Sequence, residues 1–300
     1  MTEGKHIAMF GGDARQLEVV RFLQEAGAQL SLYGFDQLDT VDTSAVKKSW
    51  QTADLSNTDA VLLPVSGIQL NGTIESMFSN ERVELSLEAL KQTPAHCKVF
   101  TGIANDTLVK LCHAANRTLI PILDRDDVAI FNSIPTAEGA VMMVIQNTDY
   151  TIHSSKVAVL GWGRTGITVA RTFHALGANV FVGARSSSHL ARIEETGYTS
   201  FHTSDMQAHL NDVNICINTI PDQMLTKDIL QTMSTNTLII DLASKPGGTD
   251  FKYAEELGLK AILAPGLPGI VAPKTAGQIL AKILSQLLQQ NDEEAKGEVS

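Results

Sequence analysis

The sequence contains little cysteine, no run of basic residues and no long uninterrupted apolar stretch. Its three cysteines, Cys97, Cys112 and Cys216, are odd in number and widely separated, without the spacing of a disulfide framework or a metal-binding motif. This pattern predicts reduced thiols in a cytoplasmic protein and no metal site. Because Cys216 lies inside an apolar strand-like run, a buried thiol is favoured there over a nucleophile.

The charge balance excludes several classes of partner. A formal net charge of −10 without a basic cluster argues against a surface for nucleic acid or for an anionic membrane. The N-terminal segment MTEGKHIAMF has no signal-peptide pattern, and no apolar stretch reaches the roughly 18 residues of a membrane-spanning helix. With 44% hydrophobic residues in a chain of 300, real cores can form. We therefore expect a cytoplasmic enzyme.

The most informative stretch, residues 156–185, reads as strand, glycine turn, helix and second strand. In a G-x-G-x-x-G turn the first glycine permits the tight bend, the second lets the backbone approach a pyrophosphate, and the third lets helix and strand pack closely. Free N–H groups at the helix N-terminus favour the anion. This order of elements predicts a dinucleotide site, a purely structural turn being the alternative. The predicted cofactor-binding residues of the turn are Gly161, Trp162, Gly163, Arg164, Thr165 and Gly166.

The end of the second strand discriminates between NAD and NADP. An NAD site usually offers Asp or Glu to the ribose 2′-hydroxyl, whereas an NADP site offers Arg and hydroxyl residues to the 2′-phosphate. The strand here ends in GARSSS, and no carboxylate occurs over 180–191. We therefore predict NADP as cofactor, with Arg185 as the phosphate clamp and Ser186 and Ser187 as hydroxyl donors. The alternative is a solvated turn, and His189 is more typical of a helix surface.

Two further loops follow predicted strands of the same unit. The strands at 213–217 and 237–241 end in NTIP and in DLASKPGG. Because the carboxyl ends of parallel strands meet at one edge of the sheet, these loops are predicted to line the ribose and the nicotinamide. Ordinary turns are the alternative. The predicted cofactor-binding residues of the two loops are Asn218, Thr219, Pro221, Asp241 and Ser244.

Strands and helices alternate along the chain, which predicts α/β architecture with two doubly wound, Rossmann-like parallel sheets joined by a bridging helix. That helix is expected to open at Ser133 with Pro135 in its first turn. A helical pattern is also expected at 83–91. The predicted domains are an N-terminal substrate-side domain over 1–131, a linking helix over 132–150, an NADP-binding domain over 151–272, a C-terminal helix over 273–290 that packs back on the first domain, and a disordered tail over 291–300.

Six motifs spread over nearly the whole chain are more specific than the glycine turn. They are GGDARQ at 11–16, PVSG at 64–67, NSIPTAEG at 132–139, GWGRTG at 161–166, DLASKPGGTDF at 241–251 and APGLPGIVAPKTAG at 264–277. On these motifs the chain closely resembles the A subunits of bacterial dipicolinate synthase. The resemblance implies an oligomeric mother-cell enzyme of sporulating bacteria that, with a flavoprotein-like B subunit, oxidises dihydrodipicolinate to dipicolinate. It also implies a fold like that of D-2-hydroxyacid dehydrogenases and S-adenosylhomocysteine hydrolases.

The implied substrate is a small dicarboxylate, and its aromatisation removes a hydride and a proton. Arg15, in the turn of the first domain, is the predicted carboxylate clamp, with Ser66 and Thr101 as hydrogen-bond partners of the other carboxylate. Lys245 is the catalytic candidate on the cofactor side, and Glu138 is the candidate base. For the arginine, serine, threonine and lysine the alternative is a solvated loop residue, and for Glu138 it is an acid that caps its helix from the first turn.

Other functions stay open. A D-2-hydroxyacid dehydrogenase needs a general acid such as a late histidine, but the last histidine is His209. An S-adenosylhomocysteine hydrolase would hold NAD, against which Arg185 argues. A non-catalytic NADPH-binding regulator or scaffold is favoured by the lack of a clear acid–base pair. The residues do not decide whether the immediate substrate is dihydrodipicolinate or its hydroxylated tetrahydro precursor, nor whether the B subunit supplies catalytic groups.

Overall fold

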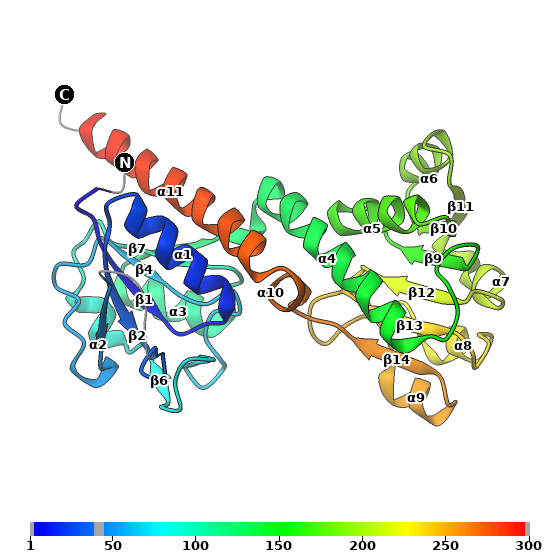
Figure 1. Ribbon diagram of the computed structural model, residues 1–300, viewed down its shortest axis with the longest axis horizontal. Coiled ribbons are helices and arrows are strands. Elements are labelled where there is room, and N and C mark those ends of the chain that lie inside the picture. The colour runs from blue at the N-terminus through cyan, green and yellow to red at the C-terminus, as the bar shows by residue number, and fades with distance from the viewer. Residues whose placement is uncertain (1–2, 39–44, 298–300) are drawn as a thin grey trace. The chain divides into compact units, whose positions relative to one another are not determined.

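The computed structural model describes residues 3–38 and 45–297, with side chains up to residue 289. The chain forms two compact units, one of residues 1–128 with 273–300 and one of residues 129–272. Figure 1 colours the first unit blue to cyan together with the red C-terminal helix, and the second green to orange. Each unit contains its own six-stranded sheet, which confirms the predicted fold class of two parallel-sheet α/β domains.

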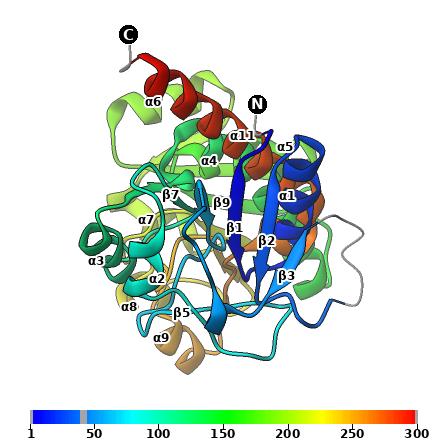
Figure 2. The same cartoon turned by 90° about the vertical axis from the view of Figure 1, so that its left-hand side faces the viewer.

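The sheet of the first unit has the strand order β3-β2-β1-β4-β7-β8, and every neighbouring pair is parallel. Figure 2 shows β1, β2 and β3 in succession. The strands are β1 (His6–Phe10), β2 (Gln29–Tyr33), β3 (Val46–Lys48), β4 (Ala60–Leu62), β7 (Lys98–Thr101) and β8 (Thr118–Pro121), and a separate antiparallel pair consists of β5 (Thr73–Ile74) and β6 (Val83–Glu84).

Alternate residues of these strands enter two cores, as expected for a sheet that is covered on both faces. Ile7 and Met9 of β1 pack with α1 and α11, whereas Ala8 and Phe10 pack with α2 and α3. The helices of this unit are α1 (Ala14–Glu25), α2 (Leu87–Gln92), α3 (Asp106–Ala115) and α11 (Pro273–Gly297), with short 3-10 turns η1 (Trp50–Thr52) and η2 (Ile122–Asp124).

The sheet of the second unit repeats this order as β11-β10-β9-β12-β13-β14, again parallel throughout. Its chain order reverses between β9 and β12, and ligands of doubly wound sheets gather at such a reversal. The strands are β9 (Lys156–Leu160), β10 (Asn179–Ala184), β11 (Thr199–His202), β12 (Ile215–Asn218), β13 (Leu238–Asp241) and β14 (Lys260–Leu263).

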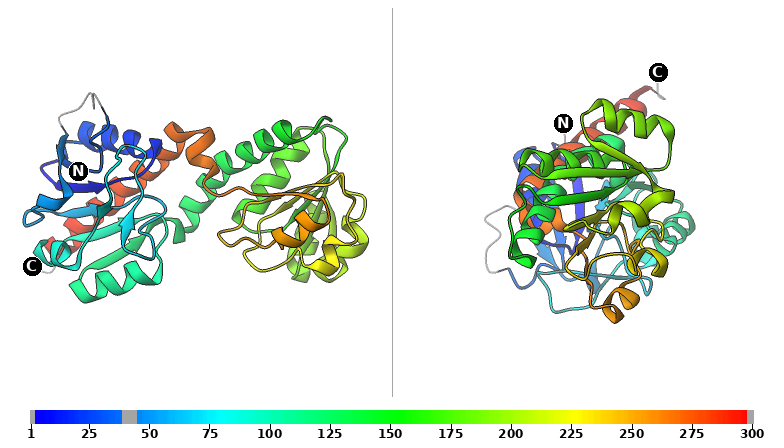
Figure 3. Two further views of the ribbon diagram at one scale, coloured as in Figure 1. Left: turned by 90° about the horizontal axis from the view of Figure 1, so that it is seen from below. Right: turned by 90° about the vertical axis from the view of Figure 1, so that its right-hand side faces the viewer.

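Helices cover both faces of this second sheet (Figure 3). Val157 and Val159 of β9 lie in the core with α4 and α5, whereas Ala158 and Leu160 lie in the core with α7, α8 and α9. The helices are α4 (Asp126–Asn147), α5 (Arg164–Ala175), α6 (Ser187–Glu195), α7 (Met206–Leu210), α8 (Lys227–Leu230), α9 (Phe251–Glu256) and α10 (Leu267–Val271), with a 3-10 turn η3 (Thr203–Asp205).

Helix α4 starts earlier than predicted. It begins at Asp126, so Pro135 lies inside the helix instead of in its first turn. The acids Asp126 and Asp127 occupy the first turn, where the helix dipole favours them. By length and mean hydropathy (22 residues, 1.5), α4 is apolar enough to cross a membrane, which corrects the expectation that no stretch would qualify. In the structure its buried face packs into the core of the second unit.

Two other predicted elements differ from the structure. The segment 83–91, predicted as one helix, pairs first as β6 and becomes helical only from Leu87, after the capping serine Ser86. The tail predicted to be disordered from Asn291 continues α11 as far as Gly297, and its central residues 293–296, EEAK, have high helix propensity. Residues 298–300 of that prediction lie outside the described chain.

Candidate dinucleotide-binding site

A pocket of about 360 Å³ opens where β9, β10 and β12 end, at the carboxyl edge of the second sheet. Its position coincides with the reversal of strand order between β9 and β12. The residues that line it are Gly161, Trp162, Gly163, Arg164, Thr165, Ala184, Arg185, Ser186, His189, Thr203, Thr219, Ile220, Pro221, Asp222 and Met224.

The three glycines of the turn have three different surroundings. A side chain at Gly161, which has φ +107°, would meet the hydroxyl oxygen of Thr219 at 2.4 Å. At Gly166 a Cβ atom would lie 2.1 Å from the carbonyl oxygen of Gly161, so this glycine lets helix and strand approach. At Gly163 no described protein atom lies within 4 Å of the Cβ position. The turn thus leaves open the space that a pyrophosphate needs, and the residues fit a dinucleotide.

The N-terminus of α5 faces this turn without a side-chain cap. Its N-cap residue is Gly163, which has no side chain to accept a hydrogen bond from the first turn. The first N–H groups of a helix need partners from outside the helix. They can be supplied by phosphate oxygens, which the helix dipole also attracts.

The turn after β10 supplies the basic and hydroxyl groups at the other end of the pocket. Arg185 is exposed, and Ser186 caps α6 by accepting a hydrogen bond from the His189 backbone at 3.3 Å. Ser187 is exposed and does not line the pocket. Six lining residues are absent from the predicted set, namely Ala184, His189, Thr203, Ile220, Asp222 and Met224. Thr203 follows β11, the neighbour of β10, and the strand at 199–202 is the signal that would have found it.

Two residues predicted to bind cofactor lie beneath the pocket instead of on its surface. Asn218 and Asp241 are fully buried and bonded to each other at 3.1 Å. The Asp241 carboxylate also accepts from the backbone of Ala243 and Gly248 and from the Thr249 hydroxyl, at 3.0, 2.8 and 2.6 Å. With its oxygens occupied in this way, Asp241 holds the 242–249 loop in place and has no free acceptor for a ribose.

The proposed catalytic residues of the second unit are not brought together around the pocket. Lys245 and Ser244 are exposed on the 242–249 loop, and neither lines the pocket. Glu138 is exposed in the middle of α4, far from the first turn, so its alternative as a helix-capping acid is wrong. Among the described residues, no group of three or more His, Cys, Asp or Glu side chains is placed to hold a metal ion.

In the first unit, Arg15 is buried and paired. Its Nε donates to Asp13 Oδ1 at 2.9 Å, and its NH2 group donates to Asp13 Oδ2 at 2.5 Å. Burial acts to raise the pKa of the Asp13 carboxyl, but the hydrogen bonds and charge of Arg15 outweigh burial and hold that pKa below its ordinary value. A substrate carboxylate at Arg15 would therefore have to use the remaining guanidinium edge or displace Asp13.

The glycines beside Arg15 do not leave open space. Gly12 donates to the Glu75 carbonyl at 2.9 Å, and a Cβ at Gly11 would lie 2.6 Å from that same oxygen. The 73–76 segment thus lies against this turn, and the position equivalent to Gly163 of the second unit is occupied by Asp13, the N-cap residue of α1. The space beside Gly11 that a substrate approaching Arg15 would use is therefore filled by the Glu75 carbonyl.

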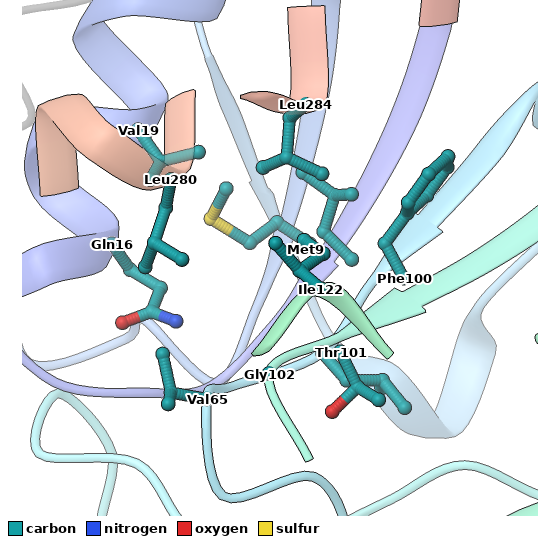
Figure 4. Close-up of a pocket in the computed structure, with 12 residues that line it drawn as sticks. Met9, Gln16, Val19, Val65, Phe100, Thr101, Gly102, Ile122, Leu280 and Leu284 are labelled. Carbon is teal, nitrogen blue, oxygen red and sulfur yellow. The ribbon is translucent and has the colours of Figure 1, made fainter. Parts of the chain in front are cut away.

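The other two predicted substrate residues differ in burial. Ser66 is exposed, whereas Thr101 is buried and its hydroxyl contacts the carbonyl oxygens of Pro64 and Ile103 at 3.0 and 3.1 Å. Figure 4 shows Thr101 at a small cavity of about 20 Å³, together with Gln16 and mainly apolar neighbours such as Met9. A hydroxyl has one proton to donate, and these backbone carbonyls already accept the proton of the Thr101 hydroxyl.

Comparison with known proteins agrees with this fold. A family model described as the alanine dehydrogenase/PNT C-terminal domain matches residues 132–299. The transhydrogenase of Sinorhizobium meliloti is 17% identical over 94% of this chain and 93% of its own, with a TM-score of 0.68. An L-alanine dehydrogenase is 16% identical over 96% and 91%, with a TM-score of 0.60. The second unit therefore has the fold of NAD(P)-dependent oxidoreductases.

More similar proteins identify the family. A family model of the N-terminal domain of the dipicolinate synthase A subunit matches residues 6–123. The dipicolinate synthase A subunit of Bacillus subtilis is 57% identical over 97% of this chain and 98% of its own. The crystal structure of the corresponding protein from Bacillus halodurans is 54% identical, covers 96% of this chain and 99% of its own, and has a TM-score of 0.93. The chain belongs to the family of dipicolinate synthase A subunits.

Proposed function

We propose that this chain binds NADP(H) in preference to NAD(H) in the pocket of the second unit. The observation that carries the proposal is the turn after β10, where Arg185 and Ser186 line the pocket and no carboxylate follows the strand. Asp222, the carboxylate among the described lining residues, follows β12 instead. Arg185 is suited to the 2′-phosphate because its planar fork binds phosphate through two parallel hydrogen bonds.

The proposed reaction is the oxidation of dihydrodipicolinate, or of its hydroxylated tetrahydro precursor, to dipicolinate. Membership of the family of dipicolinate synthase A subunits supports it. Bound NADP⁺ would supply the hydride acceptor. We propose Arg15, Ser66 and Thr101 for substrate binding, and Lys245 or Glu138 for proton transfer. The designation of the family as A subunits supports a partner B subunit. We further propose an oligomer in the mother-cell cytoplasm of a sporulating bacterium.

The cofactor assignment is tested by Arg185→Ala. NADPH binding should weaken by about 1.5–3 kcal/mol, the range for hydrogen bonds to charged groups, while NADH binding stays nearly unchanged. Titration calorimetry with both cofactors measures the difference. Arg192→Ala is the matched control, since Arg192 is exposed further along α6 and pairs with Glu195 at 2.8 Å outside the pocket. Equal losses for NADPH and NADH in Arg185→Ala would contradict the assignment.

The reaction is tested with the purified chain, in the absence and in the presence of the B subunit. Each sample receives freshly generated dihydrodipicolinate and NADP⁺, and dipicolinate absorbance and NADPH fluorescence are followed together. Coupled appearance of both products supports the oxidoreductase. Dipicolinate formed without reduction of NADP⁺ would contradict it.

A non-catalytic NADPH-binding regulator or scaffold is the second candidate. The observation in its favour is that Lys245 and Glu138 do not line the pocket, and that Arg15 is already paired with Asp13. Under this alternative the isolated B subunit would turn over the substrate, and this chain would change the rate only through NADPH binding. An assay of the isolated B subunit distinguishes the two candidates.

A further inference from the structure

The histidine at the end of β11 bonds to the turn that carries Arg185. His202 is half-buried, and its register partner across the parallel β10–β11 pair is Ala184, the last residue of β10. Its Nε2 atom lies 2.9 Å from the carbonyl oxygen of Arg185, just beyond the last paired residues of the two strands. The ring therefore connects the two strands at Arg185, one residue beyond their last backbone pair.

The hydrogen bonds of the ring determine which nitrogen carries the proton. The backbone N–H of Ser204 donates to Nδ1 of His202 at 3.2 Å, and the Ser204 hydroxyl also contacts Nδ1, at 2.7 Å. Because Nδ1 accepts, the proton of a neutral imidazole is on Nε2. Nε2–H can then donate to Arg185, whose carbonyl can only accept. His202 thus links the η3 turn to the Arg185 turn through one ring.

From this geometry we infer that His202 is a positioning residue for NADP selectivity. It does not line the pocket itself, and the inference rests on the proposed binding of the 2′-phosphate at Arg185. By holding the Arg185 carbonyl, the ring fixes the peptide between Arg185 and Ser186. That peptide sets where the guanidinium side chain starts and where Ser186 caps α6. A preorganised clamp loses less conformational freedom when it binds phosphate.

The η3 turn that His202 anchors also reaches the same end of the pocket. Thr203, the next residue, lines it together with Arg185 and Ser186. The bond between His202 and Arg185 therefore ties two lining segments to each other, one after β10 and one after β11. Both segments belong to the part of the pocket where the ribose substituent of the cofactor is read.

Two variants separate positioning from general folding. His202→Phe keeps a ring but removes both nitrogens, whereas His202→Gln keeps an N–H donor near the Nε2 position. His202→Phe should raise the NADPH Kd about three- to tenfold, as expected when one neutral hydrogen bond is lost, while the NADH Kd stays within about twofold. His202→Gln should restore most of the selectivity ratio. Both Kd values are measured by calorimetry, with Tm recorded for each variant.

His209→Phe is the matched control. His209, in α7, stacks on Phe201 of β11 with 4.7 Å between the ring centroids. It makes no bond to the Arg185 turn in the described structure. The same substitution at His209 should leave the NADPH to NADH ratio unchanged. A ratio that falls equally in both histidine variants would overturn the inference.

A double-mutant cycle tests whether His202 acts through Arg185. In an Arg185→Ala background, His202→Phe should have no further effect on NADPH binding. The same loss in both backgrounds would overturn the inference, as would an unchanged ratio in the single variant His202→Phe. If the unmodified protein binds NADH as tightly as NADPH, the proposed function fails first and the inference fails with it. These outcomes are distinguishable in one set of titrations.

Discussion

The two units share one topology but treat the first turn of the sheet in opposite ways. Both sheets have the order of a doubly wound fold, with a glycine turn between the central strand and the next helix. In the first unit, Asp13 caps α1 and the 73–76 segment lies against Gly11 and Gly12. In the second unit, α5 has no side-chain cap and Gly163 faces open space.

The difference shows that topology alone does not make a dinucleotide site. Parallel strands bring loops to one edge in both units, but only a turn with free N–H groups and an empty position beside the backbone can receive a pyrophosphate. The first unit has used its N–H groups internally, through the capping box of Asp13 and Gln16. The following predictions test this contrast.

The largest effect is expected from Gly163→Val. A branched side chain there would occupy the position that a pyrophosphate needs, so NADPH affinity should fall by more than about a hundredfold, or about 2.7 kcal/mol. No described atom lies within 4 Å of the new Cβ, so Tm should change little. Calorimetric titration and thermal unfolding measure the two quantities. A folded variant that retains its NADPH affinity would sink the glycine-turn assignment.

Arg15→Met tests whether the closed turn of the first unit still serves a substrate. Removing the cation should cost about 2–3 kcal/mol in kcat/KM for dihydrodipicolinate, as for a charged hydrogen bond left unmade, and should leave NADPH affinity intact. Arg21→Met is the control, because Arg21 is on the same helix and pairs with Glu18 at 3.0 Å on the exposed side. Normal turnover by Arg15→Met with the B subunit present would exclude a role in substrate binding and leave Arg15 only its structural pairing with Asp13.

Gly11→Ala tests the closed turn of the first unit at the position equivalent to Gly161. Gly11 has φ +53°, and its Cβ would meet the backbone oxygen of Glu75 at 2.6 Å, so we expect about 1–3 kcal/mol of destabilisation. Hydrogen exchange should locate the loss in peptides of the first unit. NADPH binding should persist while the protein is folded. Unchanged hydrogen exchange at residues 6–16 would show that the 73–76 segment moves to accommodate the new methyl group without a loss of stability.

The smallest effect concerns acid stability. The pKa of Asp13 is lowered in the folded protein, so its pair with Arg15 stabilises the fold above the ordinary carboxyl pKa of about 3.9, and this contribution is lost as pH falls through the lower folded value. Asp13→Asn keeps a capping side chain without the charge, so the stability of the first unit should fall less steeply as the pH is lowered. Trp50 fluorescence in a Trp162→Phe background reports the first unit. An unaltered acid transition would contradict the coupling.

Much of the fold follows from local pattern. The sequence pattern predicts strands at 6–10, 29–33 and 98–101 and a helix at 106–115, and these bounds agree with β1, β2, β7 and α3. They could be predicted because short apolar runs and capped helices are encoded within the segment itself. Strand β11 escapes the same reasoning because its four residues, TSFH, are mostly polar. Without that strand, the pattern could not indicate that Thr203 would line the pocket.

The site was predictable to the extent that it depends on backbone. A glycine turn after a buried strand has one geometry, so its position at the carboxyl edge could be anticipated. The pairing of side chains, in contrast, could not be predicted from the sequence. Nothing in the spacing of Asp13 and Arg15 indicates that the acid caps a helix and holds the arginine at the same time. Three of the four donors around Asp241 likewise come from a loop whose path the pattern does not reveal, and the fourth is Asn218 of β12.

The return of the last helix to the first unit has a consequence for how the protein is made. Leu280, Ile283 and Leu284 of α11 belong to the core that also contains Val20 and Leu23 of α1. A ribosome releases the chain from its N-terminus, so residues 129–272 emerge in full before α11 does. The unit that is translated first is therefore completed last. A stop codon shortly after residue 272 should destabilise the first unit, which loses α11, and should leave the nucleotide pocket of the second unit intact.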